Sequence, residues 1–304
     1  MDPSTVVVSQ EVRAAVDAGR PVVALESTIL THGLPRPENL VVARDAEELL
    51  RAAGVVPATI GVVDGRPVVG LSSGQLETLA ADPDVAKVSV RDLPVAVARG
   101  RSGGTTVAAT ALLAHAVGIA VFATGGLGGV HRGASTTFDE SADLVALSGI
   151  PVLVVSAGVK SILDVRATLE RLETLNVAVL GYRTDAFPGF YVRDSGFPVP
   201  ERVDTPAEAA AVARARDALG LRAAVLLANP VDEKSQLDVE VHRAVLAEAL
   251  AGADEHGVTG QATTPYLLDH MRRATDGASL AVNVAVYRGN VALGGEVARA
   301  LAAP

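Results

Sequence analysis

The chain has no cysteine and no tryptophan, and aromatic residues make up only 3% of its 304 residues. The absence of cysteine excludes disulfide bonds, thiolate metal sites and cysteine-dependent catalysis. Positive charge is also scarce, because 26 lysines and arginines face 35 aspartates and glutamates, giving a formal net charge of −9. Since no run of basic residues occurs, the composition argues against a partner such as nucleic acid or an anionic membrane surface. Any phosphate group must therefore be held by a local site.

The sequence shows no targeting segment. Its first 16 residues, MDPSTVVVSQEVRAAV, lack the charged and apolar regions of a signal peptide. The nearly uncharged run 103–130 is long enough to suggest a membrane span, but threonines, Gly118 and a glycine cluster interrupt it. We interpret this run as a buried helix followed by a strand, and we expect a cytoplasmic protein with no membrane partner.

Hydrophobic residues account for 49% of the chain and form short apolar runs that alternate with amphipathic segments. The apolar runs predict strands at 21–26, 58–63, 67–71, 86–90, 119–124, 151–156, 177–182 and 222–228. The amphipathic segments predict helices at 39–53, 73–82, 105–117, 140–148, 161–175, 205–219, 238–256, 264–275 and 279–302. Asp64-Gly65 predicts the turn of a hairpin over 63–69. The pattern predicts a three-layer α/β/α sandwich around a largely parallel sheet, with a helical C-terminal third. No linker or repeat divides the chain, so we expect one domain over 1–304.

Polar side chains follow three of the predicted strands, and a glycine cluster follows a fourth. The strand at 21–26 ends in Glu26, and the strand at 119–124 runs into a glycine cluster. The strand at 151–156 leads to Lys160, and the strand at 222–228 is followed by Asn229. In open α/β sheets, ligands bind beyond the carboxyl ends of the strands. We therefore expect these groups, which are distant in sequence, to meet at one edge of the sheet.

Lys160 is the first candidate for covalent chemistry. Ser161 with Asp164 resembles a capping box that would start the helix 161–175 directly after the lysine. Partial burial and the positive end of the helix dipole would then lower the pKa of the amine. An amine with a lowered pKa is a better nucleophile at neutral pH, as Schiff-base chemistry requires. Turn lysines more commonly only contact solvent, so this stretch alone leaves both interpretations open.

Two glycine-containing stretches suit a phosphorylated ligand. GRSGGTTVAATALLA (100–114) places Thr105 and Thr106 at a predicted helix start, where free N–H groups bind anions, although an ordinary capped helix fits as well. A second stretch has five glycines within residues 125–133, so its backbone can approach a ligand closely. His131 and Arg132 follow in this loop, and a guanidinium suits phosphate or carboxylate unless it is merely solvated.

Carboxylates and a second amine complete the candidates. Asp139 and Asp143 are one helical turn apart, which suits Mg²⁺ or Mn²⁺ bound largely through water, or simply two acids at a helix start. Glu26 follows an apolar strand, where desolvation would raise its pKa and suit a general acid. Lys87 could hold an anion or could be an ordinary strand-edge lysine.

Seven motifs occur in one order along the chain: ALESTILTHGLPRPENL, PATIGVVDG, KVSVRDLP, GGTTVAAT, VFATGGLGGVHRGA, TFDESADL and SAGVKSILD. Together they resemble the pseudouridine-5′-phosphate glycosidase family, also called pseudouridylate synthases. The resemblance runs from about residue 20 to the C-terminus and includes GYRTDAFPGFY, LANP and TPYLLDHM. Ser135 and Glu140 depart from the family's pattern.

The resemblance implies an enzyme that reversibly cleaves the C-glycosidic bond of pseudouridine 5′-phosphate, giving uracil and ribose 5-phosphate in pseudouridine catabolism. It implies Lys160 as covalent nucleophile, Glu26 as proton donor and Asp139 as ligand of Mn²⁺ or another divalent cation such as Mg²⁺. The substrate contacts it implies are Lys87, Val107, Ser141, Ala142 and Asp143. Residue chemistry adds four further substrate-binding candidates: Thr105, Thr106, His131 and Arg132.

The family further implies a homotrimer and a functional link to a pseudouridine kinase. Two other functions use the same features. A Schiff-base aldolase acting on another sugar phosphate would need the same lysine and phosphate loop. A non-catalytic sugar-phosphate sensor would need the phosphate loop but no nucleophile.

Overall fold

The computed structural model describes residues 5–258 and 263–303. Within them, an 11-stranded sheet has the order β1-β4-β3-β2-β7-β8-β11-β9-β10, with β6 joining β5 to β3. The strands are β1 (Val7–Val8), β2 (Val22–Leu25), β3 (Val56–Val63), β4 (Arg66–Val69), β5 (Ala86–Val88), β6 (Gly103–Thr105), β7 (Val121–Ala123), β8 (Leu153–Ser156), β9 (Ala178–Tyr182), β10 (Glu201–Val203) and β11 (Val225–Ala228). The helices are α1 (Gln10–Asp17), α2 (Glu38–Ala52), α3 (Ser73–Ala81), α4 (Leu93–Ala98), α5 (Val107–Ala116), α6 (Ala134–Thr137), α7 (Ala142–Leu147), α8 (Val165–Thr174), α9 (Pro206–Ala218), α10 (Val239–Glu255), α11 (Thr263–Ala274) and α12 (Ala278–Ala302), with a π-helical turn at Ile29–Gly33.

Strand pairing is parallel through the centre of the sheet. The neighbours β2, β7, β8 and β11 are all paired in parallel, as are β9 and β10 beyond them. Among the described strands, antiparallel ladders join β3 to β4 and β3 to β6. The first of these is a hairpin whose turn, Asp64-Gly65, has both residues at positive φ, as a two-residue type I′ turn requires. The largely parallel sheet and the hairpin confirm the sequence-based prediction.

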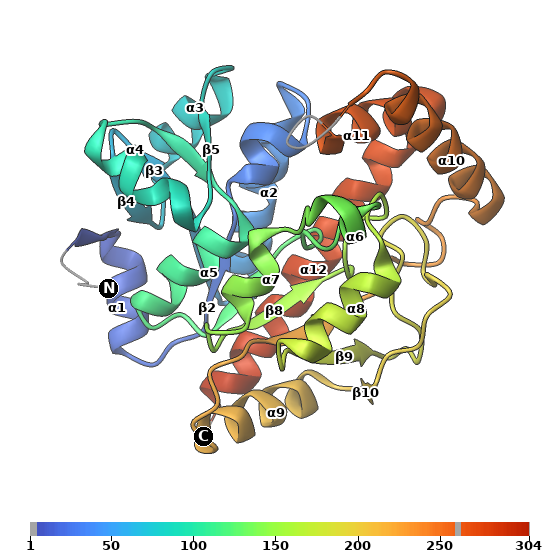
Figure 1. Cartoon of the computed structure of the whole chain (residues 1–304). Coiled ribbons are helices and arrows are strands. Elements are labelled where there is room, and N and C mark those ends of the chain that lie inside the picture. Colours follow the sequence, from blue (N-terminus) through green and yellow to red (C-terminus); the bar gives the residue numbers. More distant parts are fainter. Residues whose placement is uncertain (1–4, 259–262, 304) are drawn as a thin grey trace.

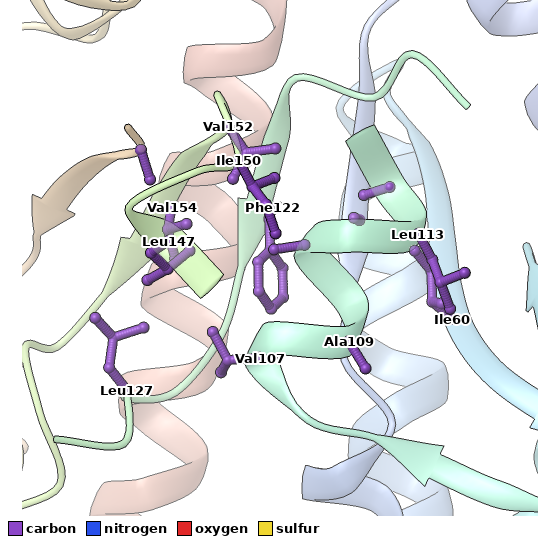
Figure 2. Packing of buried hydrophobic residues seen from close by; sticks show 14 of the residues in the cluster. Ile60, Val107, Ala109, Leu113, Phe122, Leu127, Leu147, Ile150, Val152 and Val154 are labelled. Atoms are coloured by element: carbon purple, nitrogen blue, oxygen red, sulfur yellow. The ribbon is translucent and has the colours of Figure 1, made fainter. Parts of the chain in front are cut away.

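The central strands are buried on both faces because alternate side chains enter two separate cores. In β2, Val22 and Ala24 belong to the core beneath α5, α7 and α8, whereas Val23 and Leu25 belong to the core beneath α2, α9 and α12. Figure 1 shows α7 and α8 in front of the sheet and α12 behind it. Figure 2 shows Phe122 of β7 between residues of α5 and the segment near Val152 in the first core. The two cores make the three-layer α/β/α sandwich that the sequence predicts.

Most predicted elements are present, with boundaries that differ at helix starts. The predicted helix 161–175 begins only at Val165, because Asp164 rather than Ser161 is its N-cap and accepts a hydrogen bond from Ala167 N at 2.9 Å. The predicted helix 105–117 begins at Val107, since Gly103–Thr105 pairs as β6 with β3 and β5. The predicted helix 140–148 begins at Ala142 behind the N-cap Ser141. These shifts change where the candidate site residues near the three helices lie relative to the helix starts.

The run 103–130 contains β6, α5 and β7, which confirms its interpretation as a buried helix followed by a strand. Over residues 5–258 and 263–303, none of the helices is both long and apolar enough to span a bilayer.

Candidate active site

A cavity of about 290 Å³ lies beyond the carboxyl ends of β2, β7 and β8, which are neighbours in the sheet. The chain leaves β2 for β3 on one side and β7 for β8 on the other, so the strand order reverses between β2 and β7. Such reversal points are where open α/β sheets bind ligands. The cavity is lined by Glu26, Thr28, Ile29, His32, Gly33, Lys87, Gly125, Gly126, Lys160, Phe190, Leu268 and Asn283. Three candidates from the sequence, Glu26, Lys87 and Lys160, therefore share one cavity.

Glu26 is a buried carboxyl group at the end of β2. Only 7% of the residue is exposed, and its Oε1 accepts a hydrogen bond from the Thr124 hydroxyl at the end of β7. Burial raises the pKa of Glu26 above its usual value, and the positive charge of Lys160 and the bond from Thr124 lower that pKa only in part. A protonated, buried carboxyl group suits a proton donor, as the apolar strand predicted.

Lys160 follows β8 in a turn rather than at a helix start. Its backbone N donates to Leu127 O at 3.1 Å, and Val159 forms a parallel bridge with Leu127, so the loops after β7 and β8 run side by side. The prediction that Lys160 lies at the positive end of a helix starting at residue 161 is wrong, because α8 begins at Val165. The lysine is instead held half-buried by the loop, next to Glu26 and Lys87. The loop thus places its amine in the same cavity as the Glu26 carboxyl group.

Lys87 and His32 form another wall of the cavity. Desolvation, and secondly the charge of Lys160, lower the pKa of Lys87. His32 Nδ1 lies 2.6 Å from Thr31 Oγ1, which also bonds to Ser27 O. Desolvation, with the nearby charge of Lys87, lowers the pKa of His32. The wall thus offers one cation for an anionic ligand and one imidazole that is neutral at neutral pH.

Glycines let two loops close around the cavity. A Cβ at Gly126 would lie 2.7 Å from the Phe190 ring, which lines the same cavity. Gly158, two residues before Lys160, has φ +75°, and a Cβ there would lie 2.7 Å from Phe187 and 2.8 Å from Pro188 O. Larger residues at these positions would displace the aromatic wall or the turn that presents Lys160.

The Gly-Thr stretch is engaged inside the protein rather than open at a helix start. Thr105 is fully buried, and its hydroxyl donates to Ile60 O at 2.7 Å. Thr106 is the N-cap of α5 and accepts from Ala109 N. The Asp143 carboxylate accepts from Ala108 N and Gly128 N, both at 2.9 Å. An internal carboxylate therefore accepts from the helix start predicted to bind a phosphate, and substrate binding by Thr105 and Thr106 stays a prediction.

The remaining predicted substrate contacts lie outside the cavity lining. The Val107 side chain packs in the core (Figure 2), which leaves its main chain for any contact. Ser141 is half-buried and its Oγ accepts from Asp143 N at 3.2 Å, whereas Ala142 is exposed. Arg132 lies on the wall of a different cavity. Substrate binding by these residues stays a prediction.

The predicted pairing of Asp139 with Asp143 on one helical face is wrong. Asp139 precedes α7, and its half-exposed carboxylate is 3.9 Å from His131 Nδ1, while Asp143 is only 6% exposed and bonded to backbone N–H groups. Over the described residues, no group of three or more His, Cys, Asp or Glu side chains is placed to hold a metal ion. Asp139 fits only a cation that keeps most of its ligands as water.

Sequence reasoning missed several residues that line the cavity, among them His32, Phe190, Leu268 and Asn283. Asn283 and Asn290 are the two asparagines of the mostly apolar α12, seven residues apart and so on one face. Asn290 donates to Thr124 O and Gly125 O and accepts from Asn229 Nδ2 at 3.0 Å, which ties α12 to the ends of β7 and β11. The seven-residue spacing of two asparagines in a mostly apolar helix is a sequence signal that could have indicated Asn283 and Asn290 as residues near the site.

One prediction concerns the bond between Thr124 and Glu26. Since this bond favours the ionised carboxyl group, Thr124→Val should raise the pKa of Glu26 further. If Glu26 acts as an acid, the alkaline limb of the kcat/KM profile should then move to higher pH. Thr59→Val is the matched control, because Thr59 donates to the half-buried Glu47, which does not line the cavity. Equal profiles for native protein and Thr124→Val would mean that Glu26 does not set this limb.

A largely parallel α/β sheet with an amine, a carboxyl group and a second amine at its carboxyl edge is the arrangement of an α/β enzyme. The family model described as indigoidine synthase A like protein matches residues 11–300. A protein of Saccharopolyspora erythraea named pseudouridine-5′-phosphate glycosidase is 67% identical over 99% of this chain and 100% of its own length. One of Frankia alni with the same name is 57% identical over 99% of this chain and 83% of its own length.

Two solved structures are similar throughout. The prealnumycin C-glycosynthase AlnA, in complex with ribulose 5-phosphate, is 41% identical with a TM-score of 0.91, covering 98% of this chain and 97% of its own. An indigoidine synthase A-like protein of Thermotoga maritima is 37% identical with a TM-score of 0.89, covering 98% of each chain. The chain belongs to the indigoidine synthase A-like family and, within it, to the pseudouridine-5′-phosphate glycosidases.

Proposed function

We propose that this protein cleaves the C-glycosidic bond of pseudouridine 5′-phosphate to uracil and ribose 5-phosphate, through an intermediate bound to Lys160. The observation that carries the proposal is the shared cavity of Lys160 and Glu26, an amine beside a buried carboxyl group. The names of the relatives supply the reaction, and the sugar phosphate bound by AlnA supports the substrate class.

A carbon-linked base explains why a lysine is needed. The base has no glycosidic nitrogen to protonate on departure, so the usual pair of glycosidase carboxylates does not suffice. Glu26 donates its proton to the ribose ring oxygen, and the C1′–O4′ bond breaks with its electron pair going to oxygen. The uracil ring, conjugated to C1′, stabilises the resulting electron deficiency. The neutral amine of Lys160 then forms a bond to C1′.

Cleavage follows from this adduct. The Glu26 carboxylate takes a proton from the nitrogen of the Lys160 adduct and delivers it to carbon C5 of the base. The C1′–C5 bond then breaks, and its electron pair restores the C5–C6 double bond of uracil. The nitrogen lone pair of Lys160 forms an iminium with C1′. Water adds to the iminium, and loss of the amine releases the aldehyde form of ribose 5-phosphate. The route starts from a protonated Glu26 and a neutral Lys160, and the burial that raises the pKa of Glu26 supports the first of these.

The same cavity supports recognition of the phosphate and the base. Lys87 provides a cation on one wall, and the Phe190 ring with Asn283 provides an aromatic face and an amide on another. We propose that Lys87 binds the 5′-phosphate. Of the predicted cofactors, Mn²⁺ or Mg²⁺ bound by Asp139 and hydrated elsewhere would add positive charge for a phosphate.

The metal prediction is tested at Asp139. Asp139→Asn should raise the Mn²⁺ concentration for half-maximal activity by about tenfold or more, because a single carboxylate is the anchor of the cation. Metal titrations after exhaustive chelation measure this concentration. Glu140→Gln is the control, since Glu140 pairs with Arg171 at 2.9 Å. Full activity of the chelated native protein would make Asp139 a structural residue.

The predictions about cellular location, assembly and metabolic partner remain proposals. We propose that the protein works in the cytoplasm as a homotrimer of one-domain chains and depends on a pseudouridine kinase for its phosphorylated substrate.

Incubation with pseudouridine 5′-phosphate and Mn²⁺, followed by an assay for free uracil, tests the function. Uracil release distinguishes the glycosidase from a Schiff-base aldolase, which would cleave another sugar phosphate with the same lysine. Ligand binding with neither turnover nor covalent trapping would favour a sugar-phosphate sensor.

A further inference from the structure

A second cavity lies next to the catalytic one and shares none of its lining residues. Its volume is about 850 Å³. Ser161 lines the second cavity, whereas the preceding Lys160 lines the catalytic one. In the same way, Gly189 lines the second cavity and the following Phe190 lines the catalytic one. Two thin segments of chain therefore separate the cavities. The other walls come from the first turn of α8, from one face of α10 between Val239 and Leu250, and from the segment 192–197.

The second cavity is rich in positive charge on a chain that is negative overall. Its lining has four guanidinium groups, those of Arg132, Arg166, Arg193 and Arg243, against two carboxylates. Arg193 donates one bond to Val231 O at 2.7 Å and Arg243 pairs with Glu240 at 2.8 Å, and each guanidinium keeps further donors. Both carboxylates are bonded to backbone N–H groups: Asp164 Oδ1 accepts from Ala167 N at 2.9 Å, and Asp194 Oδ1 accepts from Gly196 N at 2.7 Å. Guanidinium groups gathered in a hollow favour phosphate, whose oxygens accept their hydrogen bonds.

Two polar atoms on the same lining are buried without a partner. Ser161 Oγ and His242 Nε2 make no hydrogen bond within the described residues, and Ser161 is only 5% exposed. Most buried polar atoms in native proteins are bonded, so such atoms call for a partner from outside the chain. Ser161 was expected to cap α8, yet Asp164 holds that position and leaves the serine hydroxyl free for a ligand.

The rest of the lining is apolar and includes Val165, Val192, Phe197 and Leu246. The size of the cavity is typical of a site for a small organic molecule, and its mixture of apolar wall and convergent polar groups is typical as well. We propose that the second cavity binds a nucleoside diphosphate, with the phosphates at the arginines and Ser161 and the base against the apolar wall.

Calorimetric titration of the full-length protein with ADP tests the proposal. We expect saturable binding of one ADP per chain, and weakening by about tenfold or more in Arg166→Glu/Arg243→Glu, because charge-assisted hydrogen bonds are lost and charges are reversed. Arg166→Ala, a milder change at an exposed residue, should weaken binding in the same direction. Arg13→Glu on α1 controls for overall charge, and Lys87→Ala controls for binding in the catalytic cavity; both should bind like the native protein.

Five results would overturn the proposal. The first is the absence of saturable ADP binding. The second is an Arg13→Glu variant that weakens binding as much as Arg166→Glu/Arg243→Glu does, which would indicate unspecific electrostatic attraction. Loss of binding in Lys87→Ala would place ADP in the catalytic cavity. Inorganic pyrophosphate binding as tightly as ADP would show that the apolar wall does not bind a base. A changed oligomeric state of Arg166→Glu/Arg243→Glu would show that the cavity is an interface between copies of the chain.

Discussion

Replacing Lys160 with alanine is expected to lower the rate of uracil release from pseudouridine 5′-phosphate by about 10³-fold or more, the scale seen when a covalent nucleophile is removed. The variant should still fold, because the lysine side chain is half-buried at a cavity wall and the turn is held by the bond from Lys160 N to Leu127 O, which alanine keeps. Rates at saturating substrate measure the effect, with the melting temperature as a check on folding.

The sequence offers a close control for this experiment. The chain has only three lysines, at positions 87, 160 and 234, and Lys234 is exposed outside both cavities. Lys234→Ala should therefore keep the native rate. A Lys160→Ala variant that keeps more than about a tenth of the native rate would exclude the lysine as nucleophile.

The second large effect concerns the phosphate of the substrate. Free pseudouridine should be a very poor substrate, because each lost charge-assisted hydrogen bond costs about 1.5–3 kcal/mol and two such bonds correspond to roughly 10²–10⁴-fold. We propose Lys87, which lines the catalytic cavity and has no assigned chemical role, as this anchor. Comparison of kcat/KM for pseudouridine with and without the phosphate measures the preference.

Lys87→Met separates the anchor from the chemistry. It should lower kcat/KM for pseudouridine 5′-phosphate while leaving the slow cleavage of pseudouridine nearly unchanged, so the ratio between the two substrates falls. Uridine 5′-phosphate should resist cleavage by every variant, since its nitrogen-linked base does not form the carbon-conjugated intermediate. Equal kcat/KM for the two pseudouridine substrates with the native protein would show that no phosphate anchor exists.

The layers of the fold and the position of the site follow from local sequence patterns. Apolar runs such as 151–156 are buried on both faces by alternate side chains, and each ends in a polar group at the same edge of the sheet. Because Glu26 and Lys160 follow β2 and β8, parallel strands on either side of β7, the topology brings them together as predicted.

The predicted and observed structures differ mainly at the first residues of the helices. Ser161 and Asp164 are both good N-cap residues, and tertiary contacts decide between them, since Asp164 N donates to Val130 O at 2.9 Å in the neighbouring loop. The same holds at Ser141, which separates Asp139 from α7 and leaves the two aspartates in different environments. The walls supplied by Phe190 and Asn283 depend on long-range packing that periodicity does not encode.

Reductive trapping tests the central claim most directly. The native protein is incubated with ribose 5-phosphate and borohydride, digested, and mapped by mass spectrometry, with unlabelled peptides containing Lys87 and Lys234 as internal controls. A sugar phosphate attached to Lys160 alone is the predicted result. An adduct on Lys87 or Lys234, or no adduct while uracil is still released, would contradict a covalent role for Lys160.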